Sequence, residues 1–380
     1  MKNVTIFYGS RSEFEKIKPS SDFRSLTDMV MEIDTDSRSF IIELPDKPIP
    51  EKKKPRVENF VVGSDEYAGV REHVILNFAN FLAKMEVVNL YLQNPPLSIS
   101  TQITNLYPQT KIISQQYKTF SKADLLELHK SYSSHIKGQD AVCEKLLQAL
   151  FPLASGSQTK PTVILFYGDT GLGKTETAQC IANILNERLF RKQFSMFQNN
   201  QFATYLFGGA HYERSFAKDL LDRESNVILL DEFDKANPVF HSAFYQLFDG
   251  GIYEDQNYSL ELNKSIIICT SNYKSEDDIK SHLGNAIFSR FDAIIHFSSL
   301  APEAKREIAN MKYDEKIQHY SENDQEILRR ADLRERLVCY SEQCSNAREL
   351  SRLIDQTFSL LLINELLGKT IFGSDGDKAI

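Results

Sequence analysis

An uninterrupted apolar stretch that ends in a glycine-rich loop is the feature that most constrains the fold of this 380-residue chain. The stretch covers residues 163–167, and the loop follows directly as Gly168-Asp169-Thr170-Gly171-Leu172-Gly173-Lys174-Thr175. A continuous apolar run is typical of a strand that is buried on both faces of a parallel sheet. Residues 176–186 then place Ala178, Ile181 and Leu185 on one face of a predicted helix. The order strand, loop, helix predicts an α/β layered fold.

The loop matches the pattern GxxxxGK[ST], known as the P-loop. Its glycines allow a tight turn in which successive N–H groups point at phosphates, and the following helix N-terminus favours negative charge. We expect Lys174 to reach the β and γ phosphates of ATP and the Thr175 hydroxyl to bind Mg²⁺. The strand before the loop and the helix after it argue against a chance match. The predicted cofactor-binding residues here are Gly168, Asp169, Thr170, Gly171, Leu172, Gly173, Lys174, Thr175 and Glu176.

A second apolar run, residues 227–230, ends in the acid pair Asp231 and Glu232. Two adjacent carboxylates at the tip of an apolar strand are costly to place without a cation, which favours a metal-binding role over a solvated turn. We predict that Asp231 holds Mg²⁺ through its hydration shell, as a metal residue together with Thr175. Glu232 is predicted to orient and polarise the attacking water.

From this point the chain resembles the Clp-type AAA+ ATPases, which are protein-remodelling ring ATPases. One segment is similar to their Walker B motif and the start of the helix after it: Leu229-Leu230-Asp231-Glu232-Phe233-Asp234-Lys235-Ala236-Asn237-Pro238. Residues 244–251 resemble their helix ending in an Asp-Gly turn, and residues 252–262 alternate like their β-hairpin. Residues 265–272 form another apolar run with a polar tip. The resemblance implies that Asn272 is the sensor that helps to position the lytic water.

The same resemblance implies three further nucleotide contacts. Phe288-Ser289-Arg290-Phe291-Asp292 is similar to the family's arginine-finger segment, in which Arg290 would act on the ATP of a neighbouring subunit; the alternative is a surface ion pair. Ser345-Asn346-Ala347-Arg348-Glu349-Leu350 looks like the second sensor, with Ser-Asn where the family usually has Gly, and Arg348 is otherwise an ordinary helix arginine. In Ile136-Lys137-Gly138-Gln139-Asp140, Gly138 and Gln139 match the loop that borders the adenine.

The loop that grips substrate in Clp-type unfoldases is the main departure from the family. That loop carries an aromatic-hydrophobic-Gly tripeptide, whereas this chain has Tyr205-Leu206-Phe207-Gly208-Gly209-Ala210-His211-Tyr212. When the chain is aligned to the family from Asp231 without a gap, Phe207 falls at the position of the gripping aromatic. An alignment that matches the preceding residues and allows a gap puts His211 or Tyr212 there. An aromatic side chain at either position could hold an extended chain by packing. We name Phe207 and Tyr212 as candidate substrate-loop residues, and His211 is equally well a loop residue without a special role.

The remaining patterns divide the chain into four parts. Residues 1–118 alternate short apolar strands (4–8, 40–44, 60–62, 87–92, 111–114) with an amphipathic helix over 70–85, and a Pro-rich linker lies near 45–57. Because Gly9 and Gly63 each stand alone, no cofactor fingerprint marks this part, and we interpret it as a Rossmann-like α/β recognition or docking domain. A connecting helix over 119–135, a P-loop NTPase αβα sandwich over 136–298 and a small helical C-terminal lid over 299–380 follow.

Composition narrows the function classes further. A formal net charge of −8 argues mildly against a nucleic-acid scaffold. Five cysteines without a CxxC pair favour a reducing cytoplasm over a disulfide framework or zinc site. No apolar run approaches the ~20 residues that span a bilayer, so we expect no membrane partner.

The resulting hypothesis is an ATP- and Mg²⁺-dependent hydrolase that forms a homo-oligomeric ring, expected as a hexamer. It would remodel, unfold or disassemble a protein target selected by the N-terminal domain. Two alternatives stay open: a nucleic-acid-acting ATPase, which is less favoured, and an ATP-dependent switch that assembles with a partner effector and threads nothing.

Overall fold

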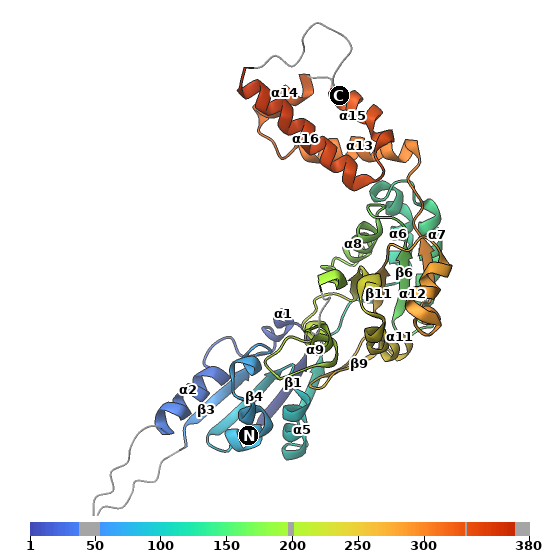
Figure 1. Cartoon of the computed structure of the whole chain (residues 1–380). Helices are drawn as coiled ribbons and strands as arrows, with labels where there is room; N and C mark the ends of the chain where they lie inside the picture. Colours follow the sequence, from blue (N-terminus) through green and yellow to red (C-terminus); the bar gives the residue numbers. More distant parts are fainter. Residues whose placement is uncertain (38–53, 197–200, 331–332, 369–380) are drawn as a thin grey trace, which may run out of the picture.

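The structure, a computed structural model, describes residues 1–37, 54–196, 201–330 and 333–368. Three modules follow one another along an arc, with the N-terminal domain and the helical lid at opposite ends of a central module (Figure 1). The strand predicted over 40–44 lies outside the described residues, as does most of the predicted linker over 45–57. The last two residues of that linker already belong to a strand.

The central module is built on five parallel strands in the order β12-β6-β11-β8-β7. Their register places Ile268 of β11 beside Ile164 of β6 and Leu229 of β8, so the carboxyl ends of the strands meet at one edge. The strands expected from the apolar runs are confirmed, whereas no expectation covered β7. Their bounds are β6 (Thr162–Tyr167), β7 (Phe190–Gln193), β8 (Val227–Asp231), β11 (Ile266–Thr270) and β12 (Ala293–His296).

Helices cover both faces of this sheet, which explains why its three central strands, β6, β11 and β8, are buried along their whole length and mostly apolar, whereas the edge strand β7 is mostly polar. Val163 and Leu165 of β6 pack in one hydrophobic core, while Ile164 and Phe166 pack in the core on the opposite face. The first core contains side chains from α9 (Gln201–Phe207), α10 (Phe216–Leu221), α11 (Tyr245–Gly250) and α12 (Glu276–Phe288). The second contains side chains from α6 (Lys122–His135), α7 (Asp140–Ala154) and α8 (Lys174–Ile184). The predicted αβα sandwich is confirmed.

Short elements complete the central module. The predicted hairpin is confirmed as the antiparallel strands β9 (Ile252–Glu254) and β10 (Ser259–Glu261). Three short 3₁₀ helices flank the sheet edge: η2 (Phe194–Met196), η3 (Phe233–Lys235) and η4 (Pro238–Phe244).

The C-terminal module is a helical lid with a hydrophobic core of its own. Tyr313, Leu337 and Phe358 are among the side chains that meet in this core. No helix in the described part of the chain is long and apolar enough to cross a membrane. The lid elements are α13 (Pro302–Ile317), α14 (Glu322–Arg330), α15 (Leu333–Tyr340), η5 (Ser341–Gln343) and α16 (Ala347–Leu366).

The N-terminal domain is an α/β unit around a second parallel sheet, with strand order β2-β3-β4-β1-β5. This order differs from the 3-2-1-4-5-6 order of the complete dinucleotide-binding fold. The strands are β1 (Asn3–Tyr8), β2 (Arg24–Ser25), β3 (Arg56–Val62), β4 (Glu86–Gln93) and β5 (Lys111–Ser114). The helices are α1 (Arg11–Phe14), α2 (Leu26–Ser37), η1 (Glu66–Gly69), α3 (Glu72–Leu76), α4 (Phe78–Leu82) and α5 (Leu97–Leu106).

The single amphipathic helix predicted over 70–85 is wrong, because the segment forms two short helices, α3 and α4. Asn77 between them has φ −124° and ψ 40°. The amide of Gln102 on α5 donates to the carbonyls of Ile75 (3.3 Å) and Leu76 (3.2 Å) and accepts from the N–H of Ala79 (3.1 Å). A side chain from elsewhere in the fold therefore satisfies the backbone groups that the break releases.

Candidate functional site

The glycine-rich loop lies between the end of β6 and the start of α8. Gly168, Gly171 and Gly173 have φ of 129°, 73° and 99°, a region that side chains with a Cβ rarely adopt. A Cβ on Gly168 would lie 2.4 Å from the carbonyl oxygen of Phe297, and one on Gly171 would lie 2.9 Å from Oδ1 of Asn346. The loop therefore requires glycine for conformation and for close packing against β12 and the lid.

Lys174 opens α8 and is buried beneath this loop. Its Nζ donates to the carbonyls of Gly168 (2.5 Å) and Asp169 (2.8 Å) and to Oδ1 of Asn272 (3.3 Å). Burial lowers the pKa of Lys174 to about 8, while nearby carboxylates, Asp234 first, oppose the shift. The predicted phosphate lysine and the predicted sensor asparagine are thus in contact.

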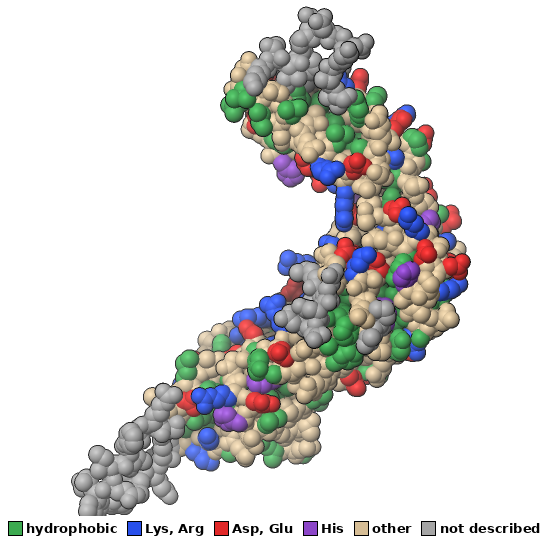
Figure 2. All heavy atoms as spheres, viewed as in Figure 1, with side chains coloured by type: hydrophobic (Ala, Val, Ile, Leu, Met, Phe, Trp, Pro, Cys, Tyr) green, Lys and Arg blue, Asp and Glu red, His purple; other side chains and the backbone are tan. Residues whose placement is uncertain are grey.

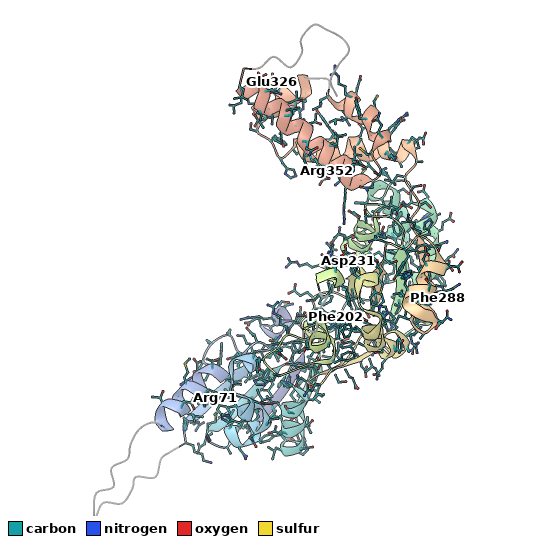
Figure 3. All side chains as sticks on the ribbon, viewed as in Figure 1. Arg71, Phe202, Asp231, Phe288, Glu326 and Arg352 are labelled. Carbon is teal, nitrogen blue, oxygen red and sulfur yellow. The ribbon has the colours of Figure 1, made fainter. Side chains whose placement is uncertain are left out.

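The acid pair lies at the end of β8, on the same edge of the sheet. Oδ1 of Asp231 accepts from the hydroxyl of Thr270 at 2.5 Å. Oδ2 of Asp231 accepts from Nε of Arg191 at 3.0 Å and also from its Nη2. Figure 3 shows Asp231 in the central module, between the lid helix with Arg352 and the N-terminal domain with Arg71. The predicted metal carboxylate is therefore paired with a guanidinium in this structure.

Glu232 follows Asp231 in a left-handed conformation with φ 55° and ψ 44°. Its N–H donates to Oγ1 of Thr270 at 2.9 Å, and its Oε2 accepts from Nε2 of Gln193 at 3.2 Å. A left-handed non-glycine residue costs on the order of 1–2 kcal/mol and persists only where its surroundings hold it. The bond to Thr270 holds the backbone of Glu232, and the bond from Gln193 orients its carboxylate.

Sequence reasoning missed Arg191, Gln193 and Thr270. Arg191 and Gln193 are two residues apart on β7, which pairs with β8 so that Gln193 lies opposite Asp231. Thr270 closes β11 one strand away. Residues two apart in a strand lie on the same face, so the spacing of Arg191 and Gln193 could have grouped them. Their contact with the acid pair could be predicted only by knowing that β7 lies beside β8.

Two adjoining cavities are lined by the predicted nucleotide residues. The smaller, about 30 Å³, has on its walls Thr170, Gly171, Gly173, Lys174, Thr175, Glu176, Asp231, Glu232, Thr270, Asn272 and Arg348. The larger, about 560 Å³, lies under the lid and shares Gly171, Gly173, Glu176 and Arg348. Leu172 also lines it, together with Ile136, Leu300 and Met311. Figure 2 shows the concave side of the arc between lid and central module as an open hollow with basic side chains on its wall.

The lid is fastened to the phosphate loop at the start of α16. The N–H of Ala347 donates to the carbonyl of Gly171 at 3.2 Å, and Asn346 caps the helix through the N–H of Glu349. Arg348 is the next residue and lines both cavities. The arginine predicted as the second sensor is therefore brought to the phosphate loop.

Gly138 and Gln139 lie behind the cavities rather than on their walls. Gln139 is buried, donates to the carbonyl of Ser298 at 2.8 Å and accepts from the Ser298 N–H at 3.3 Å. Gly138 has φ 71°, and a Cβ there would lie 2.6 Å from Cβ of Ala304. Both residues join the start of the module to the start of the lid.

Arg290 lies away from both cavities, at the end of α12. Its Nε donates to Oδ2 of Asp249 at 2.9 Å, and its guanidinium lies 4.4 Å from the ring centroid of Tyr245. It is not part of the site that its own chain forms.

The candidate substrate-loop residues differ in their surroundings. Phe207 and Tyr212 are 44% and 62% exposed, whereas His211 is buried. Nε2 of His211 donates to the carbonyl of Val70 in the N-terminal domain at 2.8 Å. His211 therefore joins two modules, and the aromatics on either side of it are open to solvent.

The residues present fit a nucleotide with Mg²⁺. Gly168, Gly171 and Gly173 take backbone conformations with positive φ, and glycine-rich loops of this kind can turn successive N–H groups toward a phosphate. Thr175 and Asp231 offer hydroxyl and carboxylate oxygens, the ligands that Mg²⁺ prefers. Oδ1 of Asp234, at the same edge, is buried without a hydrogen-bond partner. The small polar cavity at Lys174 adjoins a larger one lined partly by apolar side chains, an order that matches the phosphates and the base of ATP.

A phosphate loop at the end of one strand, facing an acid pair on the same sheet edge, defines a P-loop NTPase. Residues 159–339 match the family model of the AAA domain (Cdc48 subfamily). Over this region, just under half of its length, the chain is similar to the AAA+ ATPases, and its relatives are of the Clp type.

Relatives and solved structures agree with this placement. Chaperone protein ClpB of Malacoplasma penetrans is 26% identical over 295 residues, which cover 71% of this chain and 41% of the relative. The ATP-dependent Clp protease ATP-binding subunit ClpE of Lactococcus lactis is 29% identical over 284 residues, 65% of this chain and 38% of the relative. A closed-state structure of Hsp104 with ATPγS and FITC casein shares the fold, with TM-score 0.55 and 20% identity over 82% of this chain and 62% of that one. The chain thus spans about 40% of the length of these curated relatives.

Proposed function

We propose that this chain hydrolyses ATP and uses the energy to remodel, unfold or disassemble a protein target or complex. The observation that carries the proposal is the small polar cavity in which Lys174, Thr175, Asp231, Glu232 and Asn272 meet. These residues come from the start of α8, which follows β6 through the glycine loop, and from the carboxyl ends of β8 and β11.

Each residue has a role that follows from its place. The amides of residues 168–175 and Lys174 hold the phosphates, and Thr175 and Asp231 hold Mg²⁺. Glu232, aimed by Gln193, accepts a proton from the attacking water. Asn272 orients that water, and Arg348 joins the lid to the phosphates. When bound, MgATP supplies the phosphoryl group whose transfer to water the site promotes.

Arg290 is the reason to propose a homo-oligomeric ring, expected as a hexamer. It is partly exposed and lies outside the site of its own chain. A guanidinium adds positive charge where negative charge develops in phosphoryl transfer, so the neighbouring subunit's ATP is its proposed partner. Asp249 and Tyr245 would hold it ready for that contact.

A protein target is favoured by the relatives' names, which include a chaperone and a Clp protease subunit. We propose that the N-terminal domain selects this target. The five cysteines are free in the structure, four of them buried, which supports a reducing, cytoplasmic location.

A Glu232→Gln variant tests the function. It keeps the shape of the side chain but removes the base, so we expect ATP binding near that of the wild type and turnover lower by about 10²-fold or more. Pull-down with this variant and ATP should capture the target, whereas Lys174→Ala should capture none because it cannot hold ATP. Wild-type turnover by Glu232→Gln would contradict the proposal.

The switch that threads nothing is the second candidate, because the substrate loop departs from the family tripeptide. Phe207→Ala and Tyr212→Ala, made separately, should each slow unfolding of a tagged protein if the exposed aromatics grip a chain. Unfolding unchanged in both variants would favour the switch. ATPase stimulation by DNA but not by protein would favour a nucleic-acid-acting machine.

A further inference from the structure

The segment that carries the candidate substrate loop, residues 205–212, is fastened on two sides. We call it the substrate-loop segment. On one side the hairpin holds it: the N–H of Gln256 donates to the carbonyl of Phe207 at 3.0 Å, and Nδ2 of Asn257 donates to the carbonyl of Gly209 at 2.8 Å. On the other side the N-terminal domain holds it through the bond from His211 to the carbonyl of Val70.

The N-terminal domain also holds the hairpin itself. The N–H of Leu97, at the start of α5, donates to the carbonyl of Asn257 at 2.8 Å. Asn257 therefore links the N-terminal domain to the substrate-loop segment through its backbone and its side chain. Movement of the segment relative to the domain would break these bonds together.

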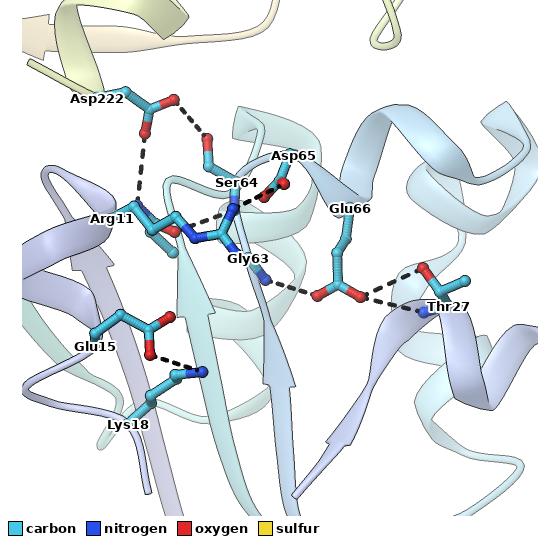
Figure 4. A network of polar contacts seen from close by, with 10 residues as sticks. Arg11, Glu15, Lys18, Thr27, Gly63, Ser64, Asp65, Glu66 and Asp222 are labelled. Atoms are coloured by element: carbon cyan, nitrogen blue, oxygen red, sulfur yellow. Dashed lines mark hydrogen bonds and ion pairs between the residues drawn. The ribbon is translucent and has the colours of Figure 1, made fainter. Parts of the chain in front are cut away.

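A single carboxylate from the central module enters the N-terminal domain beside these contacts. Asp222 directly follows α10, and its Oδ1 accepts from Nδ2 of Asn94 at 2.7 Å and from Nε2 of Gln93 at 3.5 Å. Its Oδ2 accepts from the hydroxyl of Ser64 at 3.1 Å. Figure 4 shows Asp222 reaching Ser64 at the ends of the N-terminal strands. All three donors are uncharged and buried.

The crevice that receives Asp222 is also held together by hydrogen bonds within the N-terminal domain. The Asn94 amide accepts from the N–H of Gly9 (2.8 Å) and donates to the carbonyl of Gly9 (2.9 Å). Gln93 donates to the same carbonyl (3.0 Å) and accepts from the N–H of Ser64 (3.2 Å). These bonds tie together the carboxyl ends of β1, β3 and β4 and leave one donor of each side chain for a carboxylate. Open α/β sheets bind their ligands at this edge.

The junction around this carboxylate is otherwise loosely filled. A cavity of about 740 Å³ runs along it, between the ends of β1 and β5 and the hairpin. Tyr8 and Gln115 line it from the N-terminal domain, and Ser259 and Lys264 from the central module. Besides these polar bonds, Tyr8 packs against the cores of both modules, and the hydroxyl of Tyr117 donates to the carbonyl of Arg223 at 3.2 Å. A largely polar interface between domains permits their relative motion.

We propose that the crevice formed by Ser64, Gln93 and Asn94 is a carboxylate-binding site whose occupant is Asp222 of the same chain, and that this latch clamps the substrate-loop segment. Docking of the N-terminal domain holds the segment against the hairpin, and release frees it to engage a polypeptide. An acidic side chain of a partner protein has the chemistry to replace Asp222 in the crevice. The clamp rests on the proposed protein-remodelling function.

The test compares three variants of the full chain. Asp222→Ala removes the carboxylate, Asp222→Asn keeps an acceptor of the same shape, and Ser64→Ala removes a hydroxyl whose Oγ bonds to Asp222. Asp277→Ala, on an exposed acid of α12, is the matched control. Hydrogen exchange at the amides of Leu97 and Gln256 reports docking, and fluorescence anisotropy of labelled casein with ATPγS reports access to the loop.

We expect Asp222→Ala to speed exchange at both amides at least tenfold and to tighten casein binding several-fold. Ser64→Ala should do so more weakly, and Asp222→Asn, which keeps an acceptor without a charge, should dock at least as firmly as the wild type. Exchange in Asp222→Ala equal to that in Asp277→Ala would overturn the latch, and faster exchange without tighter casein binding would overturn the clamp. A wild-type chain without ATP turnover would instead refute the proposed function, since neither readout depends on hydrolysis.

Discussion

The guanidinium of Arg191 binds the same carboxylate oxygen of Asp231 through both Nε and Nη2. Arg191 stands on β7 and Asp231 at the end of β8, so the pair bridges the two strands at the nucleotide edge of the sheet. Because Asp231 is also the proposed Mg²⁺ carboxylate, two cations compete for one group. The guanidinium is about half exposed, which allows it to swing away when the metal enters.

Removing Arg191 should therefore strengthen metal binding. A partly exposed ion pair contributes about 1 kcal/mol at most, which corresponds to roughly five-fold in a binding constant. We expect Arg191→Gln to tighten Mg²⁺ binding to the ADP-bound chain by about that factor. Titration calorimetry measures it, with Arg188→Gln, an exposed neighbour, as the control. An unchanged Mg²⁺ affinity would show that the pair does not oppose the metal.

Arg290→Ala should abolish most ATP turnover without weakening ATP binding, because the arginine lies outside its own chain's cavities. Mixing this variant with Lys174→Ala should partly restore turnover, since some interfaces then pair an intact site with an intact arginine. Arg306→Ala, in an exposed ion pair of the lid, serves as the control. If the two variants assemble together but mixing restores no ATP turnover, Arg290 does not act on the neighbouring subunit's ATP.

Alanine in place of Gly168 should lower both the stability of the chain and its binding of nucleotide. Gly168→Ala meets both a φ of 129° and a carbonyl oxygen 2.4 Å away. We expect a loss of about 1–3 kcal/mol in unfolding free energy together with loss of nucleotide binding. Gly250→Ala, which meets nothing within 4 Å, should stay within about 0.5 kcal/mol of the wild type. Thermal unfolding and binding of a fluorescent ATP analogue provide the two measurements.

The latch should depend on pH through Asp222. Burial raises the pKa of Asp222 from 3.8 to about 6, against the hydrogen bond from Ser64 and the charge of Lys218, and Asp219 raises it slightly. A raised pKa in the folded state means that this group stabilises the docked state below about pH 4. That contribution, ~3 kcal/mol for a shift of about two units, is lost as pH rises through about 6.

Denaturant unfolding of the full chain at pH 5 and pH 7.5 checks this expectation. Relative to Asp222→Asn, which cannot ionise, the wild type should gain stability at the lower pH. The other titrating groups are common to both proteins and cancel in the comparison. If the difference in unfolding free energy between wild type and variant is the same at both pH values, the ionisation of Asp222 does not affect stability in this range.

The sequence alone was sufficient to predict the strands β6 and β8 and the glycine loop at the carboxyl edge of the central sheet. A strand buried on both faces is mostly apolar, and a loop with strongly positive φ favours glycine, so local sequence pattern predicts the region around Gly168 and Lys174. The same holds for β8, whose apolar run makes the acids Asp231 and Glu232 conspicuous. These features are short-range consequences of burial and backbone sterics.

Tertiary structure alone decided which side chains from distant segments meet. Arg191 and Gln193 reach the acid pair because β7 lies beside β8 in one register, and Gln102 splits a helix that periodicity predicts as continuous. Asp222 enters the N-terminal domain only because two modules dock. Each of these contacts joins residues at least 23 positions apart. A polar side chain gives no periodic signal of its partner, because hydrogen bonds depend on position in space rather than on spacing along the chain.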